Sequence, residues 1–270
     1  KAHINLIVCG SIFSMMTKIF KDKKEPLYNR QTRFMSIKPF TPAVLKEIIA
    51  EYNPNYTAED LLALYSFTGG VAKYVQLLVD AGATTKTKML NHIIKADSVF
   101  LGEGKAILIE EFGKDYGVYF SILSAIARGK TLRSEIEQIV GREIGGYLTK
   151  LEKEYEVITK NQPIFEKSST KNVRYTIEDN FFTFWFRFIY KYNYMLEIEN
   201  YDAVKTIINR DYETFSGKML ERYFKRVLME SKAYTRIGSW WDRKGENEID
   251  IVAENELNNE TAFIEVKRKE

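Results

Sequence analysis

The sequence has 270 residues, of which 45% are hydrophobic and 29% charged, a composition typical of a folded globular protein and not of a disordered one. This length exceeds what one ordinary hydrophobic core accommodates, so we expect two or three domains. The formal net charge of +3 is too small to indicate nucleic-acid binding by itself. The sequence has no apolar run of membrane-spanning length and no signal-peptide layout, so we expect no membrane partner.

The cysteine and histidine content excludes two further classes of site. A single cysteine, Cys9, cannot form an internal disulfide and fits a reducing compartment, so we expect a cytoplasmic protein. The two histidines, His3 and His92, show neither the spacing of a zinc site nor that of a catalytic pair.

The first expected element is a strand over residues 4–11. Its sequence, INLIVCGS, is an apolar run that ends in Gly-Ser, as buried strands of parallel sheets do. A parallel strand needs neighbours, and none precedes it in the given sequence. A helix can follow over residues 12–20. We therefore expect residues 1–40 to be the C-terminal edge of a larger domain whose other strands lie upstream.

Residues 41–115 are expected to be helical. Thr41 and Pro42 form a cap and a first-turn proline, and Thr57 can cap a second helix. Further helical turns are expected over residues 71–79 and 89–109. The pair Gly69-Gly70 predicts a turn, because a phosphate-binding loop would also need a lysine and a preceding strand.

Residues 116–180 are expected to form a winged helix. Apolar residues at three- and four-residue spacing predict three helices over residues 119–127, 131–140 and 142–155. Two short strands, over residues 157–159 and 173–177, enclose a polar loop and would pair as the wing. The spacing of the helices is that of a helix-turn-helix.

Whether this domain contacts DNA or packs against protein stays open. Residues 128–174 contain ten basic and seven acidic residues, and the cations of the third helix alternate with glutamates, so little counterion release is expected there. The candidate phosphate contacts are Lys150 and Lys153 on the third helix, and Lys160, Lys167, Lys171 and Arg174 on the wing.

Residues 181–210 are expected to be a helical connector between the winged helix and the last domain. The run FFTFWFRFIY over residues 181–190 has aromatic side chains that could stack on bases. It is apolar nearly all round, which favours a core helix. The same two alternatives apply to Trp240-Trp241, and core packing is again favoured.

Two short runs near the C-terminus, residues 248–253 and 262–267, are the most informative feature. Each alternates apolar and charged residues with period two, which predicts two half-buried strands joined by an Asn- and Glu-rich turn. Alternation places Glu248 and Asp250 on one face, and Glu265 and Lys267 on one face. If the strands are neighbours, Asp250, Glu265 and Lys267 converge. Two carboxylates can hold Mg²⁺, and a lysine beside them can orient a water.

This arrangement resembles the core of the PD-(D/E)XK nuclease superfamily, which usually adds an acidic residue on the preceding helix. Glu221 lies in such a helical pattern, over residues 214–228. The resemblance implies a nuclease-like domain over residues 211–270, with Asp250 and Glu265 on the metal, Glu221 supporting the site and Lys267 assisting the water. The alternative is that these charges line a solvated face of the sheet, since a fold does not establish an activity.

A second resemblance covers most of the chain. The segments LIVCGSIFSMM, PLYNRQTRFMSIKPF and FTGGVAKYVQLL look like the later part of the AAA-type ATPases of archaea and many bacteria. The resemblance implies an ATPase edge (1–40) and a helical lid (41–115), with Ser11, Arg30 and Arg33 near the nucleotide in a longer parent protein. The phosphate-binding loop is absent, so this chain should not bind ATP tightly. Oligomers would form through the ATPase domain.

The sequence as a whole therefore predicts a multidomain, helix-rich α/β protein. We expect it to belong to an ATPase whose winged helix and Mg²⁺-dependent nuclease-like domain act on DNA. The alternative is a non-catalytic module for DNA or protein binding, in which the nuclease fold is only a scaffold. The sequence leaves open whether phosphodiester hydrolysis takes place.

Overall fold

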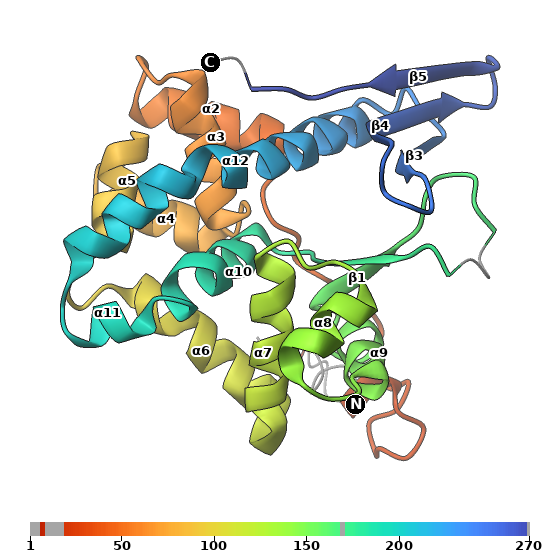
Figure 1. Ribbon diagram of the computed structural model, residues 1–270, viewed down its shortest axis with the longest axis horizontal. Coiled ribbons are helices and arrows are strands. Elements are labelled where there is room, and N and C mark those ends of the chain that lie inside the picture. The colour runs from red at the N-terminus through yellow and green to blue at the C-terminus, as the bar shows by residue number, and fades with distance from the viewer. Residues whose placement is uncertain (1–5, 9–18, 168–170, 269–270) are drawn as a thin grey trace, which may run out of the picture.

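The structure is a computed structural model that describes residues 6–8, 19–167 and 171–268 (Figure 1). The described chain is mixed α/β and rich in helix, with one two-stranded and one three-stranded sheet. Ser11 and most of the predicted first strand lie outside the described residues. Residues 6–8, which belong to that prediction, are exposed and form no strand. Residues 19–21 are helical, and the stretch to residue 41 has no further helix or strand.

The predicted helical domain begins with five helices. They are α2 (Pro42–Tyr52), α3 (Ala58–Thr68), α4 (Ala72–Asp80), α5 (Lys86–Ile93) and α6 (Val99–Phe112). Thr57 caps α3 as expected, through a capping box with Asp60. Gly69 ends α3 in the left-handed conformation, with φ of 60°, which a glycine adopts without strain. The expected helix over 89–109 is divided in two at residues 94–98.

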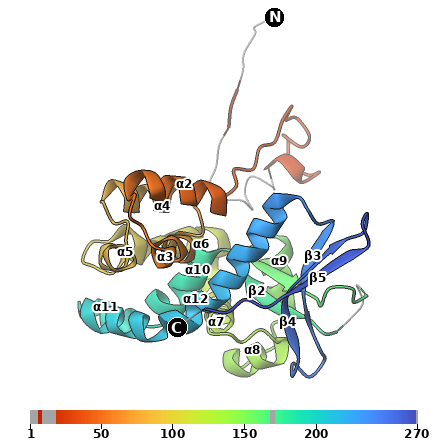
Figure 2. The same ribbon diagram turned by 90° about the horizontal axis from the view of Figure 1, so that it is seen from above.

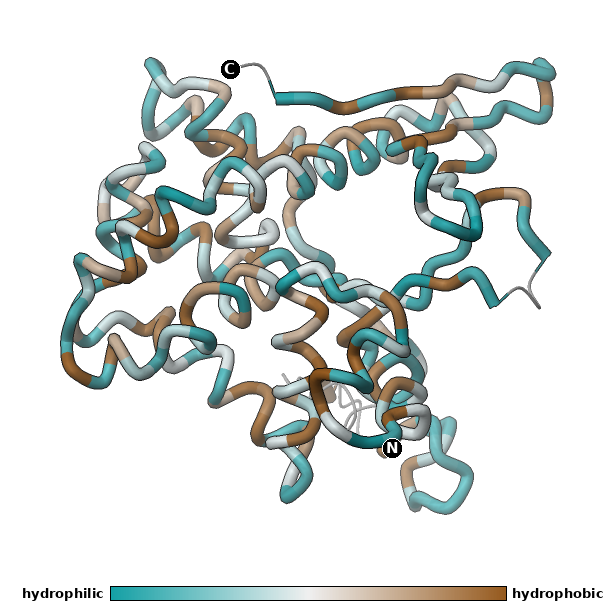
Figure 3. Tube along the Cα trace, in the orientation of Figure 1, coloured by the Kyte–Doolittle hydropathy of each residue, from teal (hydrophilic) through white to brown (hydrophobic). Residues whose placement is uncertain are grey.

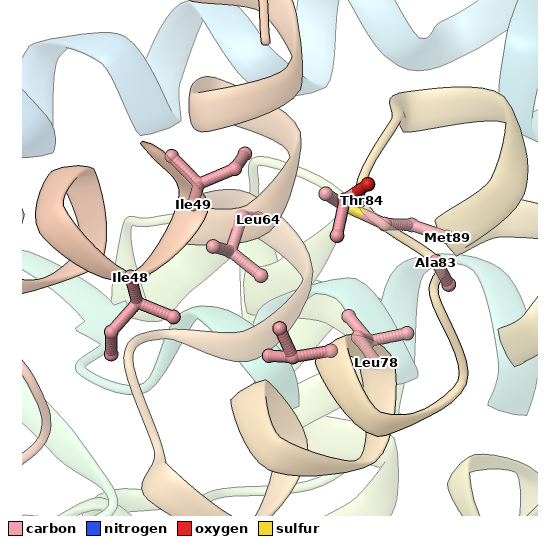
Figure 4. A pocket seen from close by; sticks show the side chains of 8 residues that line it. Ile48, Ile49, Leu64, Leu78, Ala83, Thr84 and Met89 are labelled. Carbon is pink, nitrogen blue, oxygen red and sulfur yellow. The ribbon is translucent and has the colours of Figure 1, made fainter. Parts of the chain in front are cut away.

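A small apolar cavity lies among these helices (Figure 4). Its volume is about 10 Å³, and its walls include Ile48, Leu64, Leu78 and Met89. This is about the space of one water molecule, and the walls offer it almost no polar partner. The cavity is therefore a gap in core packing and not a ligand site.

The next segment forms three helices followed by a hairpin, in the order expected from the sequence. After the short η1 (Gly113–Asp115) come α7 (Tyr116–Ala127), α8 (Arg133–Val140), α9 (Gly145–Lys153), β1 (Ile158–Asn161) and β2 (Arg174–Ile177). The two strands are antiparallel, with Ile158 opposite Ile177. Tyr175 N donates to Thr131 O at 2.8 Å, which joins the hairpin to the segment before α8.

The aromatic run forms the centre of the core. It folds into α10 (Asn180–Phe184) and η2 (Trp185–Tyr190), which is π-helical, and α11 (Asn193–Glu197) follows. Phe181, Phe184, Phe186 and Phe188 are fully buried. These rings are therefore core residues and are not available for stacking on bases. Along the helices around them, hydrophobic and hydrophilic positions interchange, as expected for helices that bury one side (Figure 3).

One long helix joins the helical part to the C-terminal sheet. The helix α12 (Tyr201–Ser231) packs on α3 at one end and approaches the sheet β3 (Arg236–Trp241), β4 (Glu248–Asn255) and β5 (Glu260–Ile264) at the other (Figures 1 and 2). The strands are antiparallel in the order β3-β4-β5. The expected boundary between residues 210 and 211 thus falls inside α12. No helix in the part of the chain that the structure describes is long and apolar enough to cross a membrane.

Candidate functional site

Acidic side chains gather where α12 passes the start of β4. We call Glu221 of α12 with Glu248 and Asp250 of β4 the acidic cluster. Glu221 forms an ion pair with Lys218, one turn earlier on α12, at 3.0 Å between Lys218 Nζ and Glu221 Oε1. The local sequence explains this placement. A three-residue spacing puts Lys218 and Glu221 on one face of the helix, and strand alternation puts Glu248 and Asp250 on one face of the sheet.

The charges of the cluster influence one another. Burial raises the pKa of Glu221; Lys218 opposes this shift, and Asp250 and Glu248 add to it. Burial favours the neutral form of Lys218, but the carboxylates of Glu221, Glu248 and Asp250 outweigh it, so the pKa of Lys218 is raised. The cluster has three carboxylates and two cationic partners, since Lys218 pairs with Glu221 and Arg174 of β2 pairs with Glu248.

The Glu-x-Lys motif follows directly after β5. The β4–β5 ladder ends at the pair Ile251–Ile264, so Glu265 and Lys267, which the alternation placed on the second strand, lie just beyond it. The chain beyond β5 still contacts β4, because the main-chain Val266 N donates to Oδ2 of the Asp250 carboxylate at 2.9 Å. The side chains of Glu265 and Lys267 are exposed, and neither makes an ion pair with another described residue.

The number of acidic, histidine and cysteine side chains that lie close together limits how a metal ion could be bound. Among residues 6–8, 19–167 and 171–268, no group of three or more His, Cys, Asp or Glu side chains is arranged to hold a metal ion. Mg²⁺ is commonly bound by only one or two carboxylates, with water and phosphate oxygens completing its shell. Asp250 and Glu265 are two carboxylates of the kind that this smaller requirement needs, and the hydrogen bond from Val266 N to Asp250 Oδ2 joins the chain beside Glu265 to Asp250.

Arg174 is placed differently from the prediction that it contacts DNA phosphates. Its Nη1 lies 2.9 Å from Glu248 Oε2, and its guanidinium lies over the Trp241 ring at 4.5 Å. The indole Nε1 of Trp241 donates to Asn172 Oδ1 at 2.9 Å, and Trp241 is buried. Arg174 therefore joins the β1–β2 hairpin to the acidic cluster and is not a free phosphate ligand. Trp241 is a core residue, as favoured from the sequence.

We predict a measurable coupling between Arg174 and Glu248. In a double-mutant cycle of Arg174→Met and Glu248→Gln, urea unfolding should give a coupling free energy of about 0.5–1 kcal/mol, since both groups are partly exposed. Arg174→Lys should lose most of the stabilisation, because an ammonium cannot reproduce the planar stacking on Trp241. Additive effects of the two substitutions would show that the contact does not stabilise the fold.

The other predicted phosphate contacts are accessible. All five lysines are exposed, and none makes an ion pair within the described ranges: Lys150, Lys153, Lys160, Lys167 and Lys171. Of the residues expected near a nucleotide, Arg30 and Arg33 are exposed and lie in a stretch without helix or strand, and Ser11 lies outside the described residues.

Sequence reasoning did not assign a role to Lys218 or Glu248. Both have a signal in the sequence: Lys218 precedes Glu221 by three residues, and Glu248 shares the strand face of Asp250. What the sequence could not show is that Arg174, from a distant hairpin, neutralises Glu248.

Comparisons with known proteins find similarity to proteins of unknown function. Residues 185–270 match the DUF234 model, described as archaea bacterial proteins of unknown function. The match includes α12, the three-stranded sheet and the whole acidic cluster. The chain is 32% identical to an uncharacterized protein of Methanocaldococcus jannaschii, in an alignment that covers 98% of this chain and 60% of that protein. No solved structure matches the chain significantly.

Proposed function

We propose that this chain belongs to an AAA-type ATPase that acts on nucleic acid, and that α12 with β3–β5 is a PD-(D/E)XK nuclease-like module. One observation carries the proposal. The charge of Asp250 adds to the raised pKa of Glu221 across the helix–sheet contact, and the Asp250 carboxylate accepts a hydrogen bond from Val266 N, directly after Glu265. These contacts support a site in which Glu221, Asp250 and the chain beside Glu265 come together at one end of the β4–β5 pair. Lys267 follows Glu265 by two residues in the same segment.

The residues support a division of roles. Asp250 and Glu265 would hold a divalent cation such as Mg²⁺, which when bound polarises a phosphodiester and lowers the pKa of a water. Glu221, with its raised pKa, is suited to share a proton near Asp250. The exposed ammonium of Lys267 can bind a phosphate oxygen or orient the attacking water.

For the segment α7–β2 we propose a winged helix that binds DNA. The order of three helices and a hairpin supports this proposal, as do the exposed lysines of α9 and of the hairpin. A protein with such cations would contact phosphates, with binding that weakens as salt rises.

A second candidate is a non-catalytic binding module. It is favoured by the ion pairs Glu221–Lys218 and Glu248–Arg174, because two carboxylates of the acidic cluster already have cationic partners. In that case the cluster serves to dock the hairpin on α12 and β4, and needs no metal ion.

Asp250→Asn distinguishes the two candidates. Under the nuclease proposal, the full-length protein that contains this chain nicks plasmid DNA only with Mg²⁺ or Mn²⁺, and the substitution abolishes nicking. Calorimetric titration of this chain with Mn²⁺ should show binding weakened about tenfold or more, because the amide keeps the shape but brings no charge. Lys267→Ala should slow cleavage and leave Mn²⁺ binding unchanged, since the lysine is assigned to water and phosphate.

The control is Glu256→Gln, an exposed carboxylate in the β4–β5 turn, which should leave both readouts unchanged. A wild-type protein that neither binds Mn²⁺ nor cleaves single-stranded, duplex or branched DNA would support the scaffold candidate. Cleavage that persists in Asp250→Asn would show that a different site or a contaminating nuclease is responsible.

A further inference from the structure

An open groove lies between the C-terminal end of α12 and the start of β3. Its volume is about 430 Å³, which is within the usual size of ligand sites of about 300–1,000 Å³. The groove is separate from the acidic cluster. Arg236, at its wall, pairs with Glu254 at one end of the β3–β4 ladder, and Glu248 pairs with Trp241 at the other end.

The groove is rich in positive charge. Its walls carry three cations, Arg226, Lys232 and Arg236, and one carboxylate, Glu230. Arg226 Nε and Glu230 Oε1 are 3.5 Å apart. Lys232 and Arg236 are exposed, and neither forms an ion pair with any residue the structure describes. Two cations are therefore left over to attract an anionic ligand.

Two aromatic rings accompany these cations. Tyr234 lies in the wall of the groove and is partly exposed. Phe165 comes from the loop between β1 and β2, which docks on β3 because Ile164 N donates to Ser239 O at 2.8 Å. The Phe165 ring lies 4.9 Å from the Arg236 guanidinium, and 49% of the residue stays exposed. The hairpin loop thus brings an accessible ring beside Arg236, a residue of the groove wall.

We propose that this groove binds an unpaired strand of nucleic acid. Lys232 and Arg236 contact phosphates, and bases stack on Tyr234 and Phe165. Interleaved cations and aromatic rings are what sequence-tolerant binding of single strands requires, since every base has a face that can stack. A duplex keeps its base faces covered, and an acidic peptide would use the cations but not the rings. The proposal deepens the proposed action on nucleic acid and does not depend on hydrolysis.

The test uses fluorescence anisotropy with a labelled 20-nucleotide oligothymidylate and a duplex of the same length. Removing Lys232 and Arg236 together, as Lys232→Gly with Arg236→Gln, should weaken binding of the single strand about tenfold or more. The slope of log affinity against log salt should fall by about 0.7 for each cation removed. Lys232 has a φ of 55°, a conformation that suits glycine, so Lys232→Gly should fold at least as well as wild type.

A second pair of variants tests whether bases stack on Tyr234. Tyr234→Leu should weaken binding about fivefold or more, and Tyr234→Phe should bind as wild type does, because it keeps the ring. A Tyr234→Leu variant with wild-type affinity would overturn the role of the ring.

Matched variants separate the groove from other surfaces. The double variant Lys150→Gln with Lys153→Gln removes two exposed cations from α9, and should weaken single-strand binding less than the groove pair does. The proposal that the groove binds the strand is contradicted if the groove double variant binds within twofold of wild type. It is also contradicted if the α9 pair alone abolishes binding, or if oligoglutamate competes as well as the oligonucleotide. A wild-type protein that binds the single strand through the groove without cleaving it would contradict only the proposed hydrolysis.

Discussion

Gly104→Ala should destabilise the protein by about 1–3 kcal/mol, although alanine favours helices more than glycine does. A Cβ at Gly104 would lie 2.4 Å from Cδ2 of Trp185, well inside contact distance. The indole cannot move aside easily. It is buried, its Nε1 donates to Leu101 O at 3.0 Å, and it stacks on Tyr190 at 5.6 Å between ring centroids. The change therefore overpacks the contact between α6 and η2.

The matched control is Gly102→Ala in the same helix. A Cβ there meets no atom within 4 Å, so this variant should gain up to about 1 kcal/mol from helix propensity. Urea unfolding followed by circular dichroism measures both variants. If Gly104→Ala is as stable as Gly102→Ala, the result would contradict close packing of α6 on Trp185.

Asp179→Asn should raise the stability of the protein at pH 7 and remove part of its pH dependence. Asp179 caps α10, where Phe182 N donates to Asp179 Oδ1 at 3.0 Å. Burial raises the pKa of its carboxyl group to about 6 from an ordinary value of 3.8, although hydrogen bonds from Phe182 and Phe181 and the charge of Arg222 oppose this. Asparagine keeps the cap without the cost of burying a charge.

The sign of the effect follows from the raised pKa. The folded state prefers the protonated carboxyl group, so the contribution of Asp179 to stability is fully present below pH 4 and is lost as the pH rises through 6. The loss amounts to at most about 3 kcal/mol. Unfolding of wild type and variant at pH 4 and pH 7 measures it, with the advantage of Asp179→Asn expected only at the higher pH. If the free energies of unfolding of wild type and variant changed in parallel with pH, ionisation of Asp179 would carry no cost in stability.

Elements with a strong local pattern could be predicted from the sequence. The alternation of residues 248–253 and 262–267 predicts the paired strands β4 and β5, although β5 ends at Ile264, before Glu265 and Lys267. The position of Thr57 predicts the cap of α3. The aromatic run could be assigned to the core because it is apolar on all sides, and its rings are buried.

Features that depend on long-range contacts could not be predicted. The sequence predicts helix over residues 181–210 but not that one helix, α12, runs from Tyr201 through the expected boundary to Ser231, because its N-terminal part packs on other helices. Arg174 resembled a wing cation in its own segment, and only the fold brings it to Glu248 and Trp241. The groove likewise combines residues of α12 and β3 with a ring from the β1–β2 loop.

Because α12 is continuous, an inserted residue rotates every side chain beyond it around the helix axis. This rotation limits which changes in length the helix can accept. Tyr212 of this 31-residue helix is buried in the helical core, and Lys218 and Glu221 lie near Glu248 and Asp250 of β4. Each inserted residue turns everything beyond it by about 100° and advances it by about 1.5 Å. One extra residue between Tyr212 and Lys218 would therefore point Glu221 away from Asp250, whereas seven would nearly restore its direction but move it along the sheet by about 10 Å. Insertions in the loops on either side carry no such penalty, so length variation should be confined to them.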